Sequence, residues 1–84
     1  MRTLTLYGKP DCSLCDKMKA VVDRVGRDVE FELEIVSIES DPGLWQRFWK
    51  DIPVLTEGSE ILFRHRTTEE ALRAALAQGT RGMT

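Results

Sequence analysis

Apolar and polar positions follow two different periods in the first part of the chain. Residues Thr3–Tyr7 (TLTLY) are short, apolar and β-prone, and Gly8 and Pro10 follow them. This pattern predicts a buried strand. Apolar residues then recur at helical spacing, at positions 14, 15, 18, 21, 22 and 25. We therefore expect a helix over Ser13–Val25, with Gly26 as the left-handed residue that ends it.

The next segment, Val29–Ile35 (VEFELEI), alternates strictly between apolar residues and glutamates. The alternation predicts a strand with one wet face, at a sheet edge where charges discourage unwanted pairing. Its buried face should hold Val29, Phe31, Leu33 and Ile35. The order strand, helix, strand implies a parallel pair joined by a right-handed crossover.

A second helix is predicted after position 40. Asp41 suits the N-cap, and Pro42 suits the first helical position. Leu44, Trp45, Phe48 and Trp49 share one face of this helix, and we expect the two tryptophans to pack inward rather than to serve a partner.

Two short strands and a helix complete the pattern. Residues 52–56 (IPVLT) and 60–63 (EILF) predict strands, and Gly58 between them predicts a hairpin. Thr67 and Glu70 form a capping-box pattern for the last helix. Its apolar side holds Leu72, Ala75 and Leu76, and Gly79 should end it.

The resulting order is β-α-β-α-β-β-α, with no repeat or linker. It predicts an α/β fold with a four-stranded mixed sheet and helices on both faces. Since the chain has only 84 residues, we expect one domain over residues 1–79 and a frayed tail over 80–84.

Composition narrows the classes of function. The net charge of −2 gives no reason to expect a nucleic-acid partner. No apolar run is long enough for a membrane span, and residues 1–11 lack the apolar core of a signal peptide. We therefore expect a cytoplasmic protein, in a compartment where a close cysteine pair is more often catalytic or metal-binding than structural.

The only two cysteines, Cys12 and Cys15, are separated by Ser13 and Leu14. A structural zinc site needs about four ligands, and this chain adds only His65 to the two thiols. We therefore expect no metal held by one chain, although a cluster shared with outside thiols stays open. A structural disulfide would close too short a loop to stabilise the fold much. A reactive dithiol is the favoured interpretation.

The two cysteines are expected to differ in environment. Cys12 falls where the helix begins, and free N–H groups and the helix dipole stabilise a thiolate there. Lys9 adds a cation nearby, whereas Asp11 and Asp16 oppose the anion. We expect a pKa of Cys12 below the ordinary value of about 8.5. Cys15 lies on the apolar stripe and should be less exposed, as suits a resolving thiol.

With these motifs in this order, the chain resembles a glutaredoxin of the thioredoxin superfamily over almost its whole length. The resemblance rests on LYGKPDCSLC after the first strand and DIPVL at the third. The pattern C-x-L-C-D is more narrowly similar to the small bacterial glutaredoxin-like proteins. The resemblance implies a three-layer thioredoxin-like fold and a cis Pro53 that faces the dithiol. It also implies that the backbone of Ile52 pairs with the substrate.

Two departures from typical glutaredoxins affect the expected use of glutathione. Cys-Ser-Leu-Cys stands where Cys-Pro-Tyr-Cys is typical. Arg64, His65 and Arg66 stand where a Gly-Gly pair usually allows the backbone of glutathione to approach. Glutathione binding is therefore expected to be weakened, although an arginine can still hold a carboxylate.

The sequence thus predicts a thiol–disulfide oxidoreductase with Cys12 as nucleophile and Cys15 as resolving thiol. Ile52 and Pro53 would form the substrate wall, and Lys9 would tune charge. We expect a monomer with no bound cofactor, acting on protein or small-molecule disulfides and reduced by glutathione or a thioredoxin reductase. Two alternatives stay open: an iron–sulfur or metal-binding module, and a redox-inert adaptor that docks through its tryptophan helix.

Overall fold

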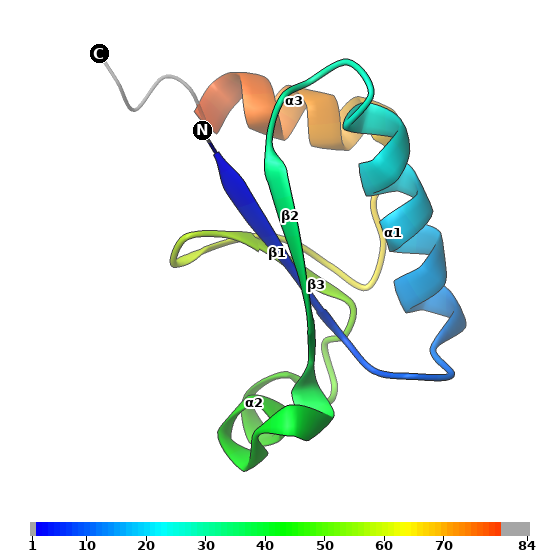
Figure 1. Ribbon diagram of the computed structural model, residues 1–84, viewed down its shortest axis with the longest axis vertical. Coiled ribbons are helices and arrows are strands. Elements are labelled where there is room, and N and C mark those ends of the chain that lie inside the picture. Colours follow the sequence, from blue (N-terminus) through cyan, green and yellow to red (C-terminus); the bar gives the residue numbers. More distant parts are fainter. Residues whose placement is uncertain (1, 80–84) are drawn as a thin grey trace.

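The computed structural model describes residues 2–79, so the tail expected over 80–84 lies outside the described residues. Figure 1 shows the arrangement of the helices and strands. The element order confirms the predicted alternation, with one added 3-10 turn. The elements are β1 (Thr3–Gly8), α1 (Ser13–Val25), β2 (Glu32–Ser37), η1 (Ile38–Ser40), α2 (Pro42–Phe48), β3 (Val54–Glu57), β4 (Glu60–Arg64) and α3 (Glu69–Gly79).

The four strands form one mixed sheet in the order β2-β1-β3-β4. β1 pairs with β2 in parallel and with β3 antiparallel, and β3 and β4 form an antiparallel hairpin. Gly58 occupies the hairpin turn with φ +61°, a conformation that glycine adopts without steric cost. The predicted edge position of the glutamate-rich strand is confirmed, because β2 has only one neighbour in the sheet.

Two apolar clusters lie on opposite faces of the sheet. One includes Leu4 and Leu6 of β1 together with buried residues of α1 and α3. The other includes Ile38 of η1 and Phe48 of α2, and Tyr7 of β1 packs against it. Because alternate strand residues point to opposite faces, α1 and α3 cover one face and α2 covers the other. The predicted three-layer α/β architecture is therefore confirmed.

Helix α1 has the predicted bounds, and its apolar stripe is buried through Cys15, Met18, Val22 and Val25. The expectation for Gly26 is wrong, because its φ of −63° is right-handed. Its N–H donates to the carbonyl oxygen of Val22 at 2.9 Å, and the chain continues in helical turns before it leaves the helix.

Strand β2 begins later than predicted and runs to Ser37. Val29, Phe31 and Leu33 pack against the core as expected. Ile35 does not, since it is 57% exposed. It pairs in register with Leu6 and so points toward the α1 face. A cavity lies between it and the helix there, so nothing covers its side chain.

Helix α2 begins as predicted, with the Asp41 carboxylate accepting a hydrogen bond from the N–H of Gly43 at 2.8 Å. The expectation that both tryptophans pack inward is wrong: Trp45 is 39% and Trp49 51% exposed. Phe48 fills the space against the sheet instead, where its ring stacks on that of Tyr7 at 4.8 Å between centroids.

Helix α3 is capped one residue later than predicted. The hydroxyl of Thr68, rather than that of Thr67, accepts a hydrogen bond from the N–H of Ala71 at 3.1 Å. The apolar side of the helix is as expected, with Leu72 and Leu76 buried. Among residues 2–79, no helix has the length and apolar character needed to cross a membrane.

Candidate functional site

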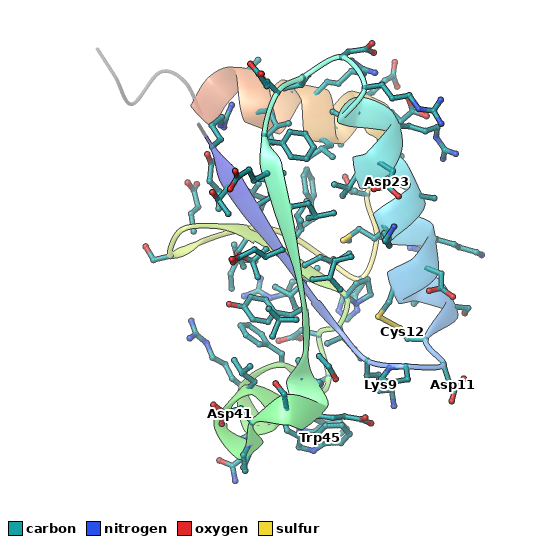
Figure 2. All side chains as sticks on the ribbon, viewed as in Figure 1. Lys9, Asp11, Cys12, Asp23, Asp41 and Trp45 are labelled. Atoms are coloured by element: carbon teal, nitrogen blue, oxygen red, sulfur yellow. A yellow bond between two sulfur atoms is a disulfide. The ribbon has the colours of Figure 1, made fainter. Side chains whose placement is uncertain are left out.

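The two cysteines lie at the start of α1, directly after the loop that leaves β1 (Figure 2). Cys12 has an extended backbone and is the N-cap residue. Its Sγ accepts a hydrogen bond from the N–H of Cys15 at 3.1 Å, and its carbonyl oxygen accepts one from the N–H of Asp16, also at 3.1 Å. The sulfur therefore takes the capping position that a serine or aspartate oxygen usually occupies.

The two sulfurs are joined in a disulfide, and their Cα atoms are 5.2 Å apart. Their environments differ as the sequence predicts: Cys15 is only 8% exposed, whereas Cys12 is half-buried. The placement of the pair is thus confirmed. The assignment of nucleophile and resolving thiol stays a prediction.

Gly8, at the end of β1, lies against the inner sulfur. A Cβ at this position would come within 2.8 Å of Cys15 Sγ, closer than carbon and sulfur can pack. The requirement for glycine here arises from this close approach. The sequence shows Gly8 only as the end of a strand, because the contact depends on how α1 folds back over β1.

The Ile52–Pro53 peptide bond is cis, as the resemblance to glutaredoxins implies. Pro53 is buried and directly precedes β3. Tyr7 pairs with Val54 in the antiparallel β1–β3 ladder, so Pro53, the residue before Val54, follows this pair at the end of β1 where Gly8 lies. Since Gly8 lies against the sulfur of Cys15, the cis proline and the disulfide lie at the same end of β1.

The backbone role expected for Ile52 stays a prediction, and the hydrogen bonds of this residue narrow it. Its N–H already donates to the carbonyl oxygen of Phe48 at 3.1 Å, so it is not available to a substrate. Within residues 2–79, no hydrogen bond reaches the carbonyl oxygen of Ile52. Backbone pairing with a substrate is therefore expected through one group of this residue rather than two.

The glutaredoxin-like domain family (DUF836) matches residues 3–77, nearly the whole chain. The chain belongs to this family. The Cys-x-x-Cys pair and the cis proline before β3 both fall within the matched region.

Solved structures agree with this membership. The solution structure of protein Ne2328 from Nitrosomonas europaea is 26% identical and has a TM-score of 0.76, covering 88% of this chain and 89% of that one. The X-ray structure of protein XcR50 from X. campestris is 29% identical, with a TM-score of 0.75 and coverage of 89% and 96%. A structure described as a malarial protein is 18% identical, with a TM-score of 0.69 and coverage of 93% and 96%, and it shows the fold alone. No curated protein matches the chain.

In this glutaredoxin-like domain, Lys9 contacts an aromatic ring. Its Nζ lies 5.7 Å from the centroid of the Trp45 ring, and Figure 2 shows Lys9 between Cys12 and Trp45. The effect of Lys9 on the Cys12 thiol stays a prediction. The sequence did not indicate the contact with Trp45, because it joins the loop after β1 to a helix far along the chain.

The segment Arg64–Arg66, which was expected to replace the glycine pair of typical glutaredoxins, has one residue with a glycine-like backbone. His65 has φ +70°, in the left-handed region, and its N–H donates to the carbonyl oxygen of Pro53 at 2.8 Å. The segment is thereby tied to the cis proline. Its side chains are exposed, and Arg64 Nε lies 3.8 Å from Asp51 Oδ2.

Two cavities lie beside the cysteine pair. One, of about 270 Å³, is lined by Gly8, Cys15, Lys19 and Ile35, among others. The second, of about 260 Å³, lies between Leu14 and Lys17 on α1 and Arg66 beyond β4. The described part of the chain brings together no group of three or more residues suited to hold a metal ion.

Proposed function

We propose that this glutaredoxin-like domain is a dithiol oxidoreductase that reduces disulfides, with Cys12 as the attacking thiol and Cys15 as the resolving thiol. The observation that most supports this is the N–H of Cys15 directed at the sulfur of Cys12 at 3.1 Å. Once the disulfide is reduced, this donor would stabilise a thiolate at Cys12, while Cys15 lies buried behind it.

The stabilisation follows from the place of Cys12 in the helix. The first N–H groups of a helix have no partner within it, and the helix dipole is positive at this end. A thiolate accepts a hydrogen bond from such a group more strongly than a neutral thiol does. The same geometry that caps α1 therefore favours the reactive form of Cys12 once the disulfide is reduced.

The reaction has two exchange steps. The Cys12 thiolate attacks one sulfur of a substrate disulfide, which forms a Cys12–substrate disulfide and releases the other substrate sulfur as a thiolate. Cys15 loses its proton to solvent and its thiolate attacks Cys12 Sγ. The second substrate thiolate then leaves, and the Cys12–Cys15 disulfide forms. Two electrons have passed to the substrate, whose two thiolates take up protons from solvent.

The surroundings of the pair suit this chemistry. Pro53 has no N–H and directly precedes Val54, which pairs with Tyr7 at the end of β1, so we assign it and Ile52 to the wall along which a substrate lies. The carbonyl oxygen of Ile52, which accepts no hydrogen bond from residues 2–79, is the group offered to a substrate N–H. Lys9 adds positive charge to the approach, which favours an anionic substrate sulfur.

We further propose that glutathione or a thioredoxin reductase returns electrons to the disulfide, and that the domain acts as a monomer in the cytoplasm. Arg64 and Arg66 offer guanidinium groups that pair with carboxylates, which supports an anionic thiol as one donor. No resident cofactor is needed, since both electrons are held by the cysteines.

Coupled turnover of bis(2-hydroxyethyl) disulfide tests the proposal. The assay runs in parallel with glutathione and glutathione reductase, and with thioredoxin reductase, each followed by NADPH consumption. Wild type should turn over with at least one system, and Cys12→Ser should lose that activity. Ser13→Ala, which leaves both thiols in place, is the matched control. Full activity in Cys12→Ser, or none in wild type with either donor, would contradict the proposal.

A further inference from the structure

Helix α2 and the residues directly after it present aromatic and cationic side chains at the surface. Trp45 and Trp49 are 39% and 51% exposed. We call these two residues, with Lys9, Arg47 and Lys50, the tryptophan surface. Monomeric proteins rarely leave large apolar side chains grouped at the surface, and such groups often mark sites of interaction.

Each cation of the tryptophan surface lies over an aromatic ring. Lys9 Nζ is 5.7 Å from the centroid of Trp45, and Lys50 Nζ is 5.4 Å from that of Trp49. Arg47 Cζ is 5.0 Å from the centroid of Phe48. The rings thus hold the three charges in place while leaving them open to solvent on the outer side.

These charges lack acidic partners. Within residues 2–79, neither Lys9, Arg47 nor Lys50 forms an ion pair. Of the carboxylates near α2, that of Asp41 caps the helix and that of Asp51 lies 3.8 Å from Arg64, whereas Glu39 of η1 adds a further negative charge beside the helix. The surface therefore presents three cations that form no ion pair with residues 2–79, on a chain whose net charge is −2.

The tryptophan surface adjoins the cysteine pair. Lys9 belongs to the loop that leads from β1 to Cys12, and its ammonium group lies over Trp45 (Figure 2). A polypeptide whose cysteine meets Cys12 would therefore bring its neighbouring residues over Lys9 and Trp45.

We propose that the tryptophan surface is the docking site for protein disulfides whose cysteine is flanked by acidic and aromatic residues. The inference rests on the proposed function, since it names the substrate class of the same site. Charge complementarity selects this occupant: acidic side chains meet the three cations, and aromatic side chains cover the two indoles. A second copy of the chain would place like charges against each other in a two-fold contact, which is unfavourable.

Docking can be measured without chemistry, because Trp45 and Trp49 are the only tryptophans in the chain. Their fluorescence is followed during titration with a peptide of sequence EFDSDFE, in which serine replaces the reactive cysteine. The matched peptide, KFKSKFK, reverses the charges. We expect a saturable change with the acidic peptide, weakened by salt, and binding of the basic peptide at least about tenfold weaker.

Charge reversal then locates the site. Lys50→Glu should weaken binding of the acidic peptide about tenfold. Arg27→Glu makes the same change in charge just after the C-terminal end of α1, far along the helix from Cys12. This variant should bind the acidic peptide as wild type does. The same two peptides are then made with cysteine in place of serine and joined in disulfides as substrates. The kcat/KM of the acidic substrate divided by that of the basic substrate should fall in Lys50→Glu and stay unchanged in Arg27→Glu.

Equal binding of both peptides, or an equal loss in Lys50→Glu and Arg27→Glu, would overturn the inference. Tighter binding of a single-stranded oligonucleotide than of the acidic peptide would also overturn it, as would self-association through this face in sedimentation. Failure of the proposed function is distinguishable. Selective binding of the serine peptide without any disulfide exchange supports the docking site while contradicting the oxidoreductase.

Discussion

Gly8 and the sulfur of Cys15 lie so close that a single added methyl group at position 8 would come within 2.8 Å of it. The disulfide to Cys12 holds that sulfur in place, and Gly8 itself is part of a buried strand. The end of β1 is therefore shaped by the oxidised cysteine pair that lies over it.

Gly8→Ala should destabilise the oxidised protein by about 1–3 kcal/mol, the usual cost of overpacking a core. The reduced protein should suffer less, because a free Cys15 side chain can rotate away. The Cys12–Cys15 disulfide of Gly8→Ala should accordingly be reduced more readily than that of wild type. Its midpoint of reduction should lie at a lower ratio of reduced to oxidised glutathione. Urea unfolding of both redox forms and equilibration in glutathione buffers measure these effects.

Gly43→Ala is the control for that substitution, since the nearest atom to its added Cβ belongs to the exposed side chain of Asp41, at 3.3 Å. We expect a change in unfolding free energy within about 1 kcal/mol. Unaltered stability and an unaltered redox equilibrium in Gly8→Ala would refute the role given to this contact.

A second prediction concerns the ion pair between Arg2 and Glu57. Two hydrogen bonds of 2.8 Å join the guanidinium and the carboxylate, and Arg2 also donates to the carbonyl oxygen of Leu76. The hydrogen bonds from Arg2 lower the pKa of Glu57, against a smaller opposing effect of burial. The folded carboxylate thus has a lower pKa than the unfolded one, about 4.3. Its contribution to stability is full above that value and is lost as the pH falls through the folded pKa.

Glu57→Gln should therefore lower the free energy of unfolding at pH 7 by about 1–3 kcal/mol and flatten its decline below pH 5. Urea unfolding from pH 7 to pH 3 measures both. Glu60→Gln removes one charge from the same hairpin, at a side chain that pairs with none of the residues described, and should leave the profile nearly unchanged. An identical acid decline in wild type and Glu57→Gln would be inconsistent with this role.

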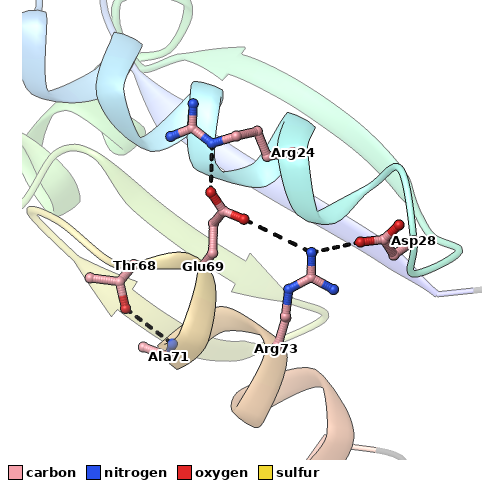
Figure 3. A network of polar contacts seen from close by, with 6 residues as sticks. All are labelled: Arg24, Asp28, Thr68, Glu69, Ala71 and Arg73. Carbon is pink, nitrogen blue, oxygen red and sulfur yellow. Dashed lines mark hydrogen bonds and ion pairs between the residues drawn. The ribbon is translucent and has the colours of Figure 1, made fainter.

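A third prediction concerns the cap of α3, drawn in Figure 3. The Thr68 hydroxyl accepts a hydrogen bond from the N–H of Ala71, and Glu69 next to it pairs with Arg24 on α1 at 2.7 Å. Thr68→Ala should cost about 0.5–2 kcal/mol of unfolding free energy. Thr67→Ala should cost less, because the Thr67 hydroxyl makes only a 3.4 Å contact with a carbonyl oxygen. Thermal unfolding of the two variants compares them directly, and an equal or larger loss in Thr67→Ala would place the cap where the sequence pattern predicted it.

The sequence predicted the elements whose periodicity is strong and local. Helix α1 has its predicted bounds because six apolar positions and the helix start agree, and the hairpin follows from Gly58. The asymmetry of Cys12 and Cys15 followed from the same helix, since a residue at the start and one on the stripe must differ in exposure.

Features that depend on distant elements were not predictable in this way. Ile35 lies on the correct face, but only the position of α1 decides that a cavity rather than a side chain lies opposite it. Trp45 and Trp49 were predicted to share a helical face with Phe48, yet of these three aromatic residues only Phe48 is buried against the sheet. Thr67 and Thr68 compete for one capping role, and the chain path after β4 selects the second.

The central claim is that the two cysteines have different roles, and trapping of the mixed disulfide tests it most directly. Reduced Cys15→Ser and Cys12→Ser are each mixed with bis(2-hydroxyethyl) disulfide at neutral pH, quenched with acid and analysed by intact mass spectrometry. We predict that Cys15→Ser rapidly accumulates one mercaptoethanol adduct at Cys12, that Cys12→Ser stays largely unmodified, and that wild type ends as the Cys12–Cys15 disulfide without an adduct. Equal adduct formation in both variants, or adduct only at Cys15, would contradict the account.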